Sequence, residues 1–78
     1  MTTEVRLFAA AAAAAGVTTT RSDARTLTAL QTALLDDFPE LGPVMLRCSF
    51  LVDGTLARGD VALDGVTTVD VLPPFAGG

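Results

Sequence analysis

The residues best suited to chemistry are the last two of the chain. The sequence closes with Pro73, Pro74, Phe75, Ala76, Gly77 and Gly78. Glycine has no Cβ, so an extended diglycine can enter a narrow channel of another enzyme where any side chain would clash. A terminal carboxylate becomes reactive once ATP converts it to an acyl-adenylate, and a sulfur donor can then turn it into a thiocarboxylate. The tail therefore predicts that Gly78 is itself the reactive group.

The composition offers no second reactive centre. The 78 residues include no His and one Cys, so no set of residues has zinc or iron–sulfur ligand spacing and no internal disulfide can form. Cys48 falls on the apolar face of an expected strand, without His or Lys nearby in sequence, and is interpreted as an inert core thiol. Asp36 and Asp37 are interpreted as a solvated helix end. We expect no bound metal, no bound cofactor and a reducing compartment.

The charged residues argue against nucleic acid as a partner. Five Arg, no Lys and nine acidic residues give a net charge of -4, and no stretch concentrates positive charge. A genome rich in G and C would account for the missing Lys. Without a side-chain amine, chains linked through isopeptide bonds to this protein's own C-terminus could grow only through its N-terminus.

An apolar stretch at 7–17 is similar to the central region of a secretory signal. Glu4 accompanies Arg6 before it, however, so the usual positive excess is missing. The stretch is also shorter than the roughly 20 residues that a membrane span requires. We therefore expect a cytoplasmic protein that does not bind membranes.

Periodicity predicts the elements that position the tail. We expect a strand at 5–9 with Phe8 on its second face, a short helix through the Ala run ended by Gly16, and a second strand at 17–20 pairing with the first. Thr26 should cap a main helix that stops at Pro39. Its apolar stripe consists of Leu27, Leu30, Leu34, Leu35 and Phe38.

The second half of the sequence predicts three further strands. After a connector at 40–43, we expect a strand at 46–52 with Leu46, Cys48, Phe50 and Val52 on a common face. Asp53 and Gly54 should form a turn into a short extended piece at Leu56. The last strand, at 67–72, ends where two prolines remove successive backbone donors.

This element order predicts an α+β fold of the β-grasp, ubiquitin-like type. One main helix should pack across a mixed sheet whose opening and closing strands form a parallel central pair. The whole chain, 1–78, is expected to be one domain, with 72–78 projecting from it as a flexible C-terminal tail.

The motifs together resemble the small subunit of molybdopterin synthase. The resemblance rests on 5–9, the helix starting near Thr26, 52–56 and the closing 69–78, and it covers essentially the whole chain. It implies a ubiquitin-like sulfur carrier that is not catalytic alone. Gly78, preceded by Gly77, would be adenylated by an E1-like enzyme that consumes ATP. A sulfur donor such as a persulfide sulfurtransferase would then leave a C-terminal 1-thioglycine.

The resemblance also implies the acceptor and the docking residues. The tail would insert into the large synthase subunit, within a heterotetramer, and two sulfur transfers would build the molybdopterin dithiolene from a cyclic pyranopterin precursor. Seven residues map onto partner-binding positions: Phe8, Leu56, Leu72, Pro73, Pro74, Phe75 and Ala76. Strand alternation supports exposure of Phe8 and Leu72, although the main helix could instead cover them.

Two stretches depart from the pattern of the resembled subunits. Their first helix often carries charged residues that help to hold the activating enzyme, whereas this chain has only Ala at 10–15. That contact is expected elsewhere, for example through Arg6. The second departure is 66–68, where an acidic turn is common, and it affects only local recognition.

Other functions remain open from the sequence. The same carrier chemistry could supply sulfur for cysteine, the thiamine thiazole, tRNA thiolation or a secondary metabolite, although the Pro-Pro-Phe before the diglycine argues against thiamine. A different class would be a ubiquitin-like protein modifier, or an interaction module with an inert tail.

Overall fold

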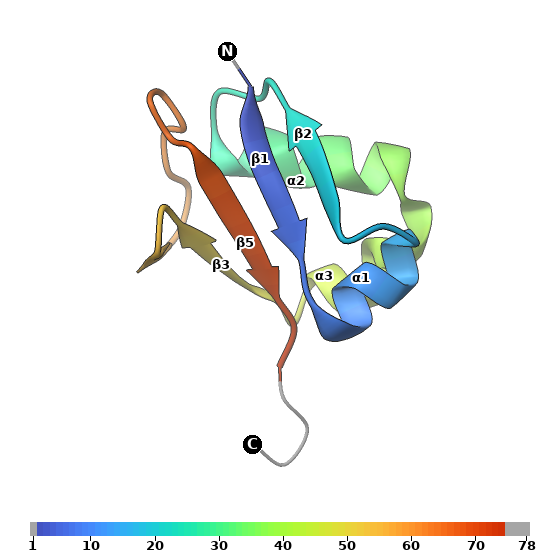
Figure 1. The fold of residues 1–78 in the computed structure, drawn as a ribbon. Coiled ribbons are helices and arrows are strands. Elements are labelled where there is room, and N and C mark those ends of the chain that lie inside the picture. Colours follow the sequence, from blue (N-terminus) through green and yellow to red (C-terminus); the bar gives the residue numbers. More distant parts are fainter. Residues whose placement is uncertain (1, 75–78) are drawn as a thin grey trace.

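The computed structural model describes residues 2–74 and is built on a mixed five-stranded sheet in the order β2-β1-β5-β3-β4 (Figure 1). The strands are β1 (Thr3–Leu7), β2 (Thr19–Ser22), β3 (Ser49–Val52), β4 (Thr55–Leu56) and β5 (Thr68–Leu72). The central strands β1 and β5 are parallel, and the other pairs are antiparallel. The predicted β-grasp arrangement, with its parallel central pair, is confirmed.

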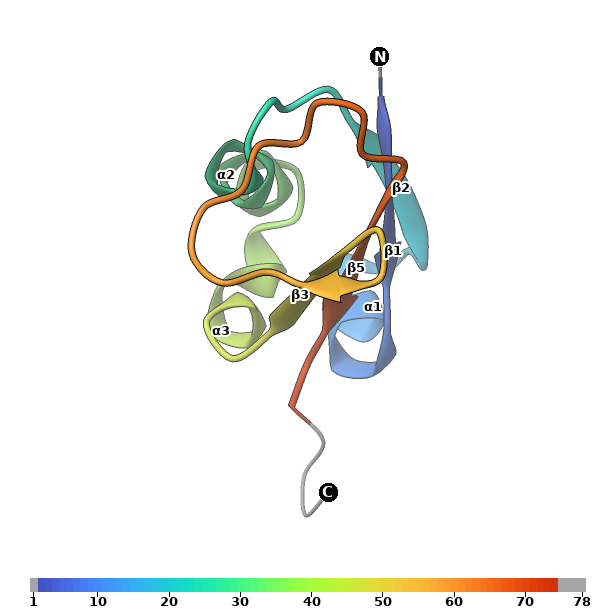
Figure 2. The same ribbon diagram turned by 90° about the vertical axis from the view of Figure 1, so that its left-hand side faces the viewer.

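The helices leave one face of the sheet uncovered. They are α1 (Ala9–Ala15), α2 (Leu27–Asp37), the 3-10 helix η1 (Pro39–Leu41) and α3 (Gly42–Met45). Seen from the side in Figure 2, α2 and α3 lie to the left of the central strands, and no helix lies to their right. The short helix α1 contacts η1, α3 and β5 at the end of the sheet where β5 stops. No helix within residues 2–74 is long and apolar enough to span a membrane.

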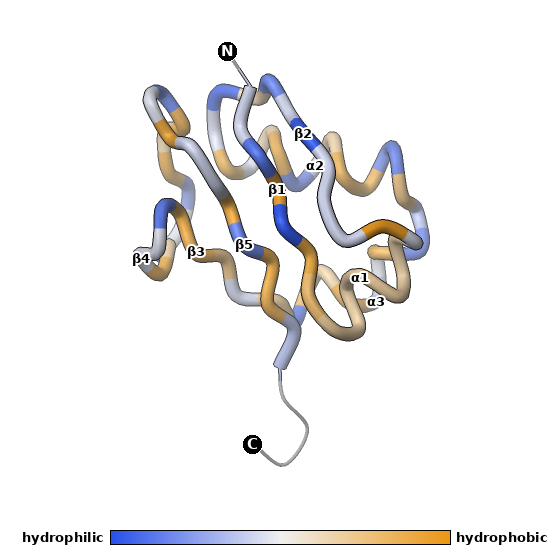
Figure 3. The backbone as a smooth tube through the Cα atoms, in the orientation of Figure 1, coloured by the Kyte–Doolittle hydropathy of each residue, from blue (hydrophilic) through white to orange (hydrophobic). Residues whose placement is uncertain are grey.

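The core forms where alternate strand residues meet the α2 stripe. Figure 3 shows apolar and polar residues alternating along β1 and β5. The apolar residues of β1 and β5 face α2. The buried residues of α2 are the first three of its predicted stripe, and Leu35 and Phe38 are partly buried at the edge of the core. The largest fully buried side chains are Val5, Leu30, Leu41, Val69 and Val71. Burying one such aliphatic side chain stabilises the fold by about 1.5–3 kcal/mol.

Two side chains from distant parts of the chain cap α2. The predicted cap Thr26 is confirmed, because its Oγ1 accepts a hydrogen bond from the Ala29 N–H at 3.1 Å. Asp60 adds a second cap, with Oδ1 accepting from the Thr28 N–H at 2.9 Å and from the Val61 N–H at 3.0 Å. The Thr28 hydrogen bonds are the main reason why the pKa of Asp60 lies below its ordinary value.

The prediction of a connector at 40–43 and of a strand that starts at 46 is wrong, whereas the second half of that strand is confirmed as β3. Pro39 is the first residue of η1 and Pro43 the second residue of α3, because the fixed φ of proline suits the first turn of a helix. Leu46 ends α3 and is 90% exposed, so it shares no face with Phe50. Cys48 precedes β3 and is half-buried, with Sγ 3.3 Å from the Val44 carbonyl oxygen. Burial raises the pKa of the Cys48 thiol.

Two smaller boundaries also differ from the prediction. The second strand runs over Thr19–Ser22 instead of 17–20, and Val17 lies exposed in the loop before it. Ala9, expected to end the first strand, begins α1 at a positive φ of 51° and redirects the chain after Phe8. The predicted end of this helix is confirmed, since Gly16 is left-handed with φ 79°.

The predicted turn at Asp53 and Gly54 joins β3 to β4. Both residues have positive φ, 48° and 84°, which matches a type I′ hairpin turn. The Asp53 carboxylate also accepts hydrogen bonds from the backbone N–H groups of Thr67, at 3.0 Å, and Thr68, at 2.9 Å. The turn is therefore bonded to the start of β5.

Candidate docking site at the base of the tail

The base of the tail is the point where β5 ends against two helices. β5 stops at Leu72, after which Pro73 is buried and Pro74 is exposed. Both prolines line a shallow cleft of about 370 Å³ between α1 and α3, together with Ala10, Pro43, Val44 and Arg47. A buried Pro73 fixes the point from which the chain leaves the domain. Phe75, Ala76, Gly77 and Gly78 lie outside the described residues.

Strand register gathers apolar side chains on the uncovered face of the sheet. Leu51 of β3 pairs with Leu56. Leu72 pairs with Ser49, which lies in β3 two residues before Leu51. Directly paired residues share a face, so Leu51, Leu56 and Leu72 point away from the core. Phe8 continues the pairing of β1, since its N–H donates to the Val71 carbonyl at 3.2 Å, and alternation places it on the same face.

We call Phe8, Leu51, Leu56 and Leu72 the open-face patch. Phe8 is 40% exposed and Leu56 47% exposed, while Leu51 and Leu72 are half-buried. The main helix lies on the opposite face and covers none of them. The docking role expected for Phe8, Leu56 and Leu72 stays a prediction, but the structure brings all three to one surface.

Leu51 is a patch residue that sequence reasoning missed. It lies in a run where both faces of the strand are apolar, Phe50 pointing inward and Leu51 outward. The apolar and polar residues of β3 therefore do not alternate in a way that indicates which side chains point outward. Only the pairing of Leu51 with Leu56 and with Asp70 reveals its position on the open face.

An ion pair lies in the middle of the same face. Arg6 and Asp70 are directly paired in the parallel register, and the guanidinium meets the carboxylate side-on. The Nε–Oδ1 distance is 2.6 Å and the Nη2–Oδ2 distance is 3.0 Å. The side-chain hydrogen bonding to Asp70 and the negative charge of Asp70 raise the pKa of Arg6 above its ordinary value. Arg6 is thus not a free cation on the surface.

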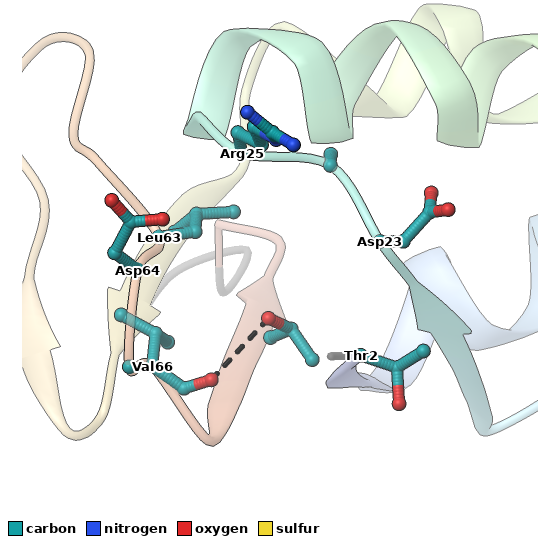
Figure 4. A pocket seen from close by; sticks show the side chains of 9 residues that line it. Thr2, Asp23, Arg25, Leu63, Asp64 and Val66 are labelled. Atoms are coloured by element: carbon teal, nitrogen blue, oxygen red, sulfur yellow. Dashed lines mark hydrogen bonds between the residues drawn. The ribbon is translucent and has the colours of Figure 1, made fainter.

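A second, polar pocket of about 430 Å³ lies at the other end of the sheet. Figure 4 shows Asp23, Arg25 and Asp64 around it, next to the hydrogen bond of 3.3 Å from Thr3 Oγ1 to the Val66 carbonyl. Thr3 begins β1 and Val66 precedes β5, whereas both strands end beside Pro73 at the base of the tail. The pocket is therefore far from the base of the tail. Within residues 2–74, no three potential metal-ligating side chains lie together.

The sheet order, the helix α2 across it and the tail after β5 define a ubiquitin-like protein of the β-grasp class. The ThiS family matches residues 5–78. The chain therefore belongs to the ThiS family of ubiquitin-like sulfur carriers. Sequence resemblance to a carrier of this kind is confirmed at the family level.

Solved structures show the same fold. SAMP1 from Haloferax volcanii has a TM-score of 0.78 and 26% identity, with all of both chains covered. Small archaeal modifier protein 1 from Methanosarcina acetivorans has a TM-score of 0.78 and 22% identity, over 99% of this chain and 96% of that one. A chain from the complex of subunits 1 and 2 of the molybdopterin-converting factor of Helicobacter pylori has a TM-score of 0.66 and 23% identity, with both chains fully covered. No curated protein sequence matches significantly.

Proposed function

We propose that this chain is the sulfur-carrying small subunit of a molybdopterin synthase. The observation that carries the proposal is an exposed apolar sheet face beside Pro73 and Pro74, in a chain of the ThiS family whose sequence ends in diglycine. The Helicobacter pylori complex supports it, since the similar protein there is paired with a second subunit of a molybdopterin-converting factor. The partner that fits this chain is accordingly a large synthase subunit.

The chemistry belongs to the terminal carboxylate. In an E1-like enzyme the Gly78 carboxylate attacks the α-phosphate of ATP, and pyrophosphate leaves. The terminal sulfur of a persulfide donor then displaces AMP. A second thiol releases the thiocarboxylate by forming a disulfide with the donor cysteine. ATP is thus a substrate of the activating enzyme and not a ligand of this domain.

Sulfur transfer requires the tail to reach a second active site. Four residues follow Pro74, and a fully extended chain of that length spans at most about 14 Å. The open-face patch would hold the large subunit at the base of this arm. Holding the two proteins together converts the attack of the sulfur on the pyranopterin precursor into an effectively intramolecular step. The sulfur forms a C–S bond as an oxygen substituent of the precursor leaves, so Gly78 is joined to the pterin through a thioester. Water hydrolyses this thioester and regenerates the carboxylate, and a second thiocarboxylated chain completes the dithiolene.

Intact-mass spectrometry of the protein from its own host tests the first half of this proposal. We expect a species in which one carboxylate oxygen of Gly78 is replaced by sulfur. The second half is tested by mixing this species with the large subunit and the precursor and measuring molybdopterin. A free carboxylate that persists with ATP, the E1-like enzyme and a sulfur donor would contradict the carrier function.

A protein-modifying function is the second candidate. It is favoured by the likeness to SAMP1 at 26% identity over the whole chain, together with the small archaeal modifier protein from Methanosarcina acetivorans. Such a protein would form an isopeptide bond between Gly78 and a lysine amine of a target. Because this chain has no Lys, polymers of it would require its N-terminus. Mass spectrometry of target lysines separates the modifier from the carrier.

A further inference from the structure

The Arg6–Asp70 pair occupies an unusual place in the sheet. Asp70 lies in β5, a central strand, and is only 8% exposed, although Asp is depleted in strands and is seldom buried unless it is paired. Two apolar residues of similar size would satisfy this position, since replacing a buried ion pair in this way is often neutral or stabilising. The stability of the fold therefore gives no reason for a charged pair here.

The pair borders the open-face patch. One cross-strand row on this face runs from Arg6 through Asp70 and Leu51 to Leu56. Phe8 and Leu72 follow two residues later on their strands, nearer the tail. The side chain of Asp70 is 12% exposed and that of Arg6 46%, so the guanidinium shields the carboxylate from solvent. A partner covering the patch would thus meet Arg6 at the edge of the contact, on the β1 side.

Hydrogen-bond capacity remains on the outer side of the guanidinium. Arginine has five N–H donors, and Asp70 engages one at Nε and one at Nη2. Both carboxylate oxygens are taken by these two bonds. Within residues 2–74 the two N–H groups of Nη1 and the second of Nη2 have no acceptor. Unless a partner supplied acceptors, docking would bury these donors unpaired, at a cost in free energy.

We propose that Asp70 is a positioning residue that holds Arg6 so that its free N–H groups bind backbone carbonyl oxygens of the docked partner. Carbonyl groups fit better than a partner carboxylate, because the Arg6–Asp70 pair already neutralises its own charge. The partner is then a protein surface that presents a loop or strand end, with free carbonyls, inside an apolar contact. This inference rests on the proposed function for the identity of the partner, the large synthase subunit.

The decisive variant replaces both charges by apolar residues, Arg6→Leu with Asp70→Val. Affinity for the large subunit from the same organism is measured by calorimetry, and the thermal midpoint by circular dichroism. We expect an unchanged or higher midpoint together with affinity at least about tenfold weaker, since the acceptors of the partner lose their donors. Equal or tighter binding would overturn the inference, because the enlarged apolar patch alone would then suffice.

A second variant serves if the double one does not fold. Arg6→Lys keeps the charge and a bond to Asp70 but loses the planar fork, so we expect binding several-fold weaker with folding retained. Arg21→Leu is the matched control, because Arg21 pairs with Glu4 on the same face but away from the patch. Binding of Arg6→Lys as tight as that of this control would contradict the positioning role.

Ionic strength distinguishes the two kinds of acceptor. With carbonyl acceptors, the affinity of the unaltered chain should change less than about threefold between 0.05 and 0.5 M NaCl. A loss of tenfold or more would indicate a partner carboxylate and overturn the assignment. If the unaltered chain does not bind the large subunit at all, the proposed function fails and this inference fails with it. Binding that tolerates the double variant rejects this inference alone.

Discussion

Leu56 has the most exposed side chain of the open-face patch and contributes least to the fold. It belongs to β4, which has two residues, and its only direct neighbour in the register is Leu51. An apolar side chain that is 47% exposed gains little from folding and much from being covered by a partner. At the scale of single residues, a substitution of Leu56 therefore best separates an effect on docking from an effect on stability.

The variant Leu56→Asp should weaken binding of the large subunit at least about tenfold, because docking would remove the new carboxylate from water. The free energy of unfolding should change by no more than about 0.5 kcal/mol, as expected for a surface position. Calorimetry and urea unfolding measure the two quantities. Leu46→Asp is the matched control, since Leu46 is exposed but lies outside the patch. Equal binding by both variants would exclude the patch as the docking surface.

Sequence predicted some of these residues and not others for a physical reason. Phe8 and Leu72 follow from alternation within one strand, where Val5, Leu7, Val69 and Val71 define the inner face. The Arg6–Asp70 pair joins residues 64 positions apart, and nothing local in either strand indicates the other. Pairing between distant strands fixes such contacts, and a single sequence does not display that register.

The start of α2 shows how one element depends on a distant loop. Thr26 caps the helix locally, but Asp60 reaches the same end from 32 residues away. The Leu27 N–H also donates to the Val61 carbonyl at 2.8 Å, and Thr26 forms a β-bridge with Ala62. The loop before β5 is thereby fastened to the N-terminal end of the main helix.

This capping predicts a pH dependence of stability. The folded-state pKa of Asp60 is lowered, so its contribution is complete above the unfolded-state pKa of about 4 and is lost as the pH falls through the lowered value. Asp60→Ala should reduce stability at pH 7, and the difference from the unaltered chain should shrink toward zero in acid. Urea unfolding from pH 7 to pH 2 measures it. Asp64→Ala, at an exposed residue that caps no helix, is the control at pH 7, where it should change the free energy of unfolding by no more than about 0.5 kcal/mol.

The largest difference between the predicted and the observed elements lies between the main helix and β3. Alternating apolar residues at 46–52 predicted one strand, but Pro39 and Pro43 start helical turns that extend through Met45. Leu46 is therefore the C-cap of α3, and Cys48 lies between the following turn and β3. A short apolar stretch fits both periods, and tertiary packing of Leu41 and Met45 into the core decides between them.

Two glycines give a matched test of backbone conformation. Gly54 has φ 84° in the hairpin turn, whereas Gly42 has φ -49° at the start of α3, and a Cβ at either would meet no atom within 4 Å apart from the adjacent residues. Gly54→Ala should destabilise the fold by about 1–2 kcal/mol, because left-handed backbone is unfavourable for alanine. Gly42→Ala should cost less than Gly54→Ala, because its φ is allowed for alanine and the helix propensity gained offsets the restriction on a residue before proline. Thermal unfolding compares them, and a larger loss of stability for Gly42→Ala would contradict the turn geometry.

At the scale of the whole molecule, the features proposed for docking lie on one face and at one end. The open face carries the patch and the ion pair, and β1 and β5 run parallel toward the buried Pro73. The helices and the core occupy the opposite face, and the polar pocket lies at the far end of the sheet. The core and the surface proposed for partner binding are thus separate parts of a small domain.

That separation predicts that the tail can be changed without cost to the fold. Deleting Gly78 shortens the arm by one residue of at most about 3.6 Å and moves the carboxylate out of reach of the activating site. Adenylation, followed as ATP–pyrophosphate exchange with the E1-like enzyme, should fall at least about 100-fold, because even small misplacements of a reacting group are costly. The thermal midpoint should stay the same, and Asp64→Ala, at the far end of the sheet, should retain full exchange. Undiminished exchange by the shortened chain would show that the diglycine end is not the reactive group.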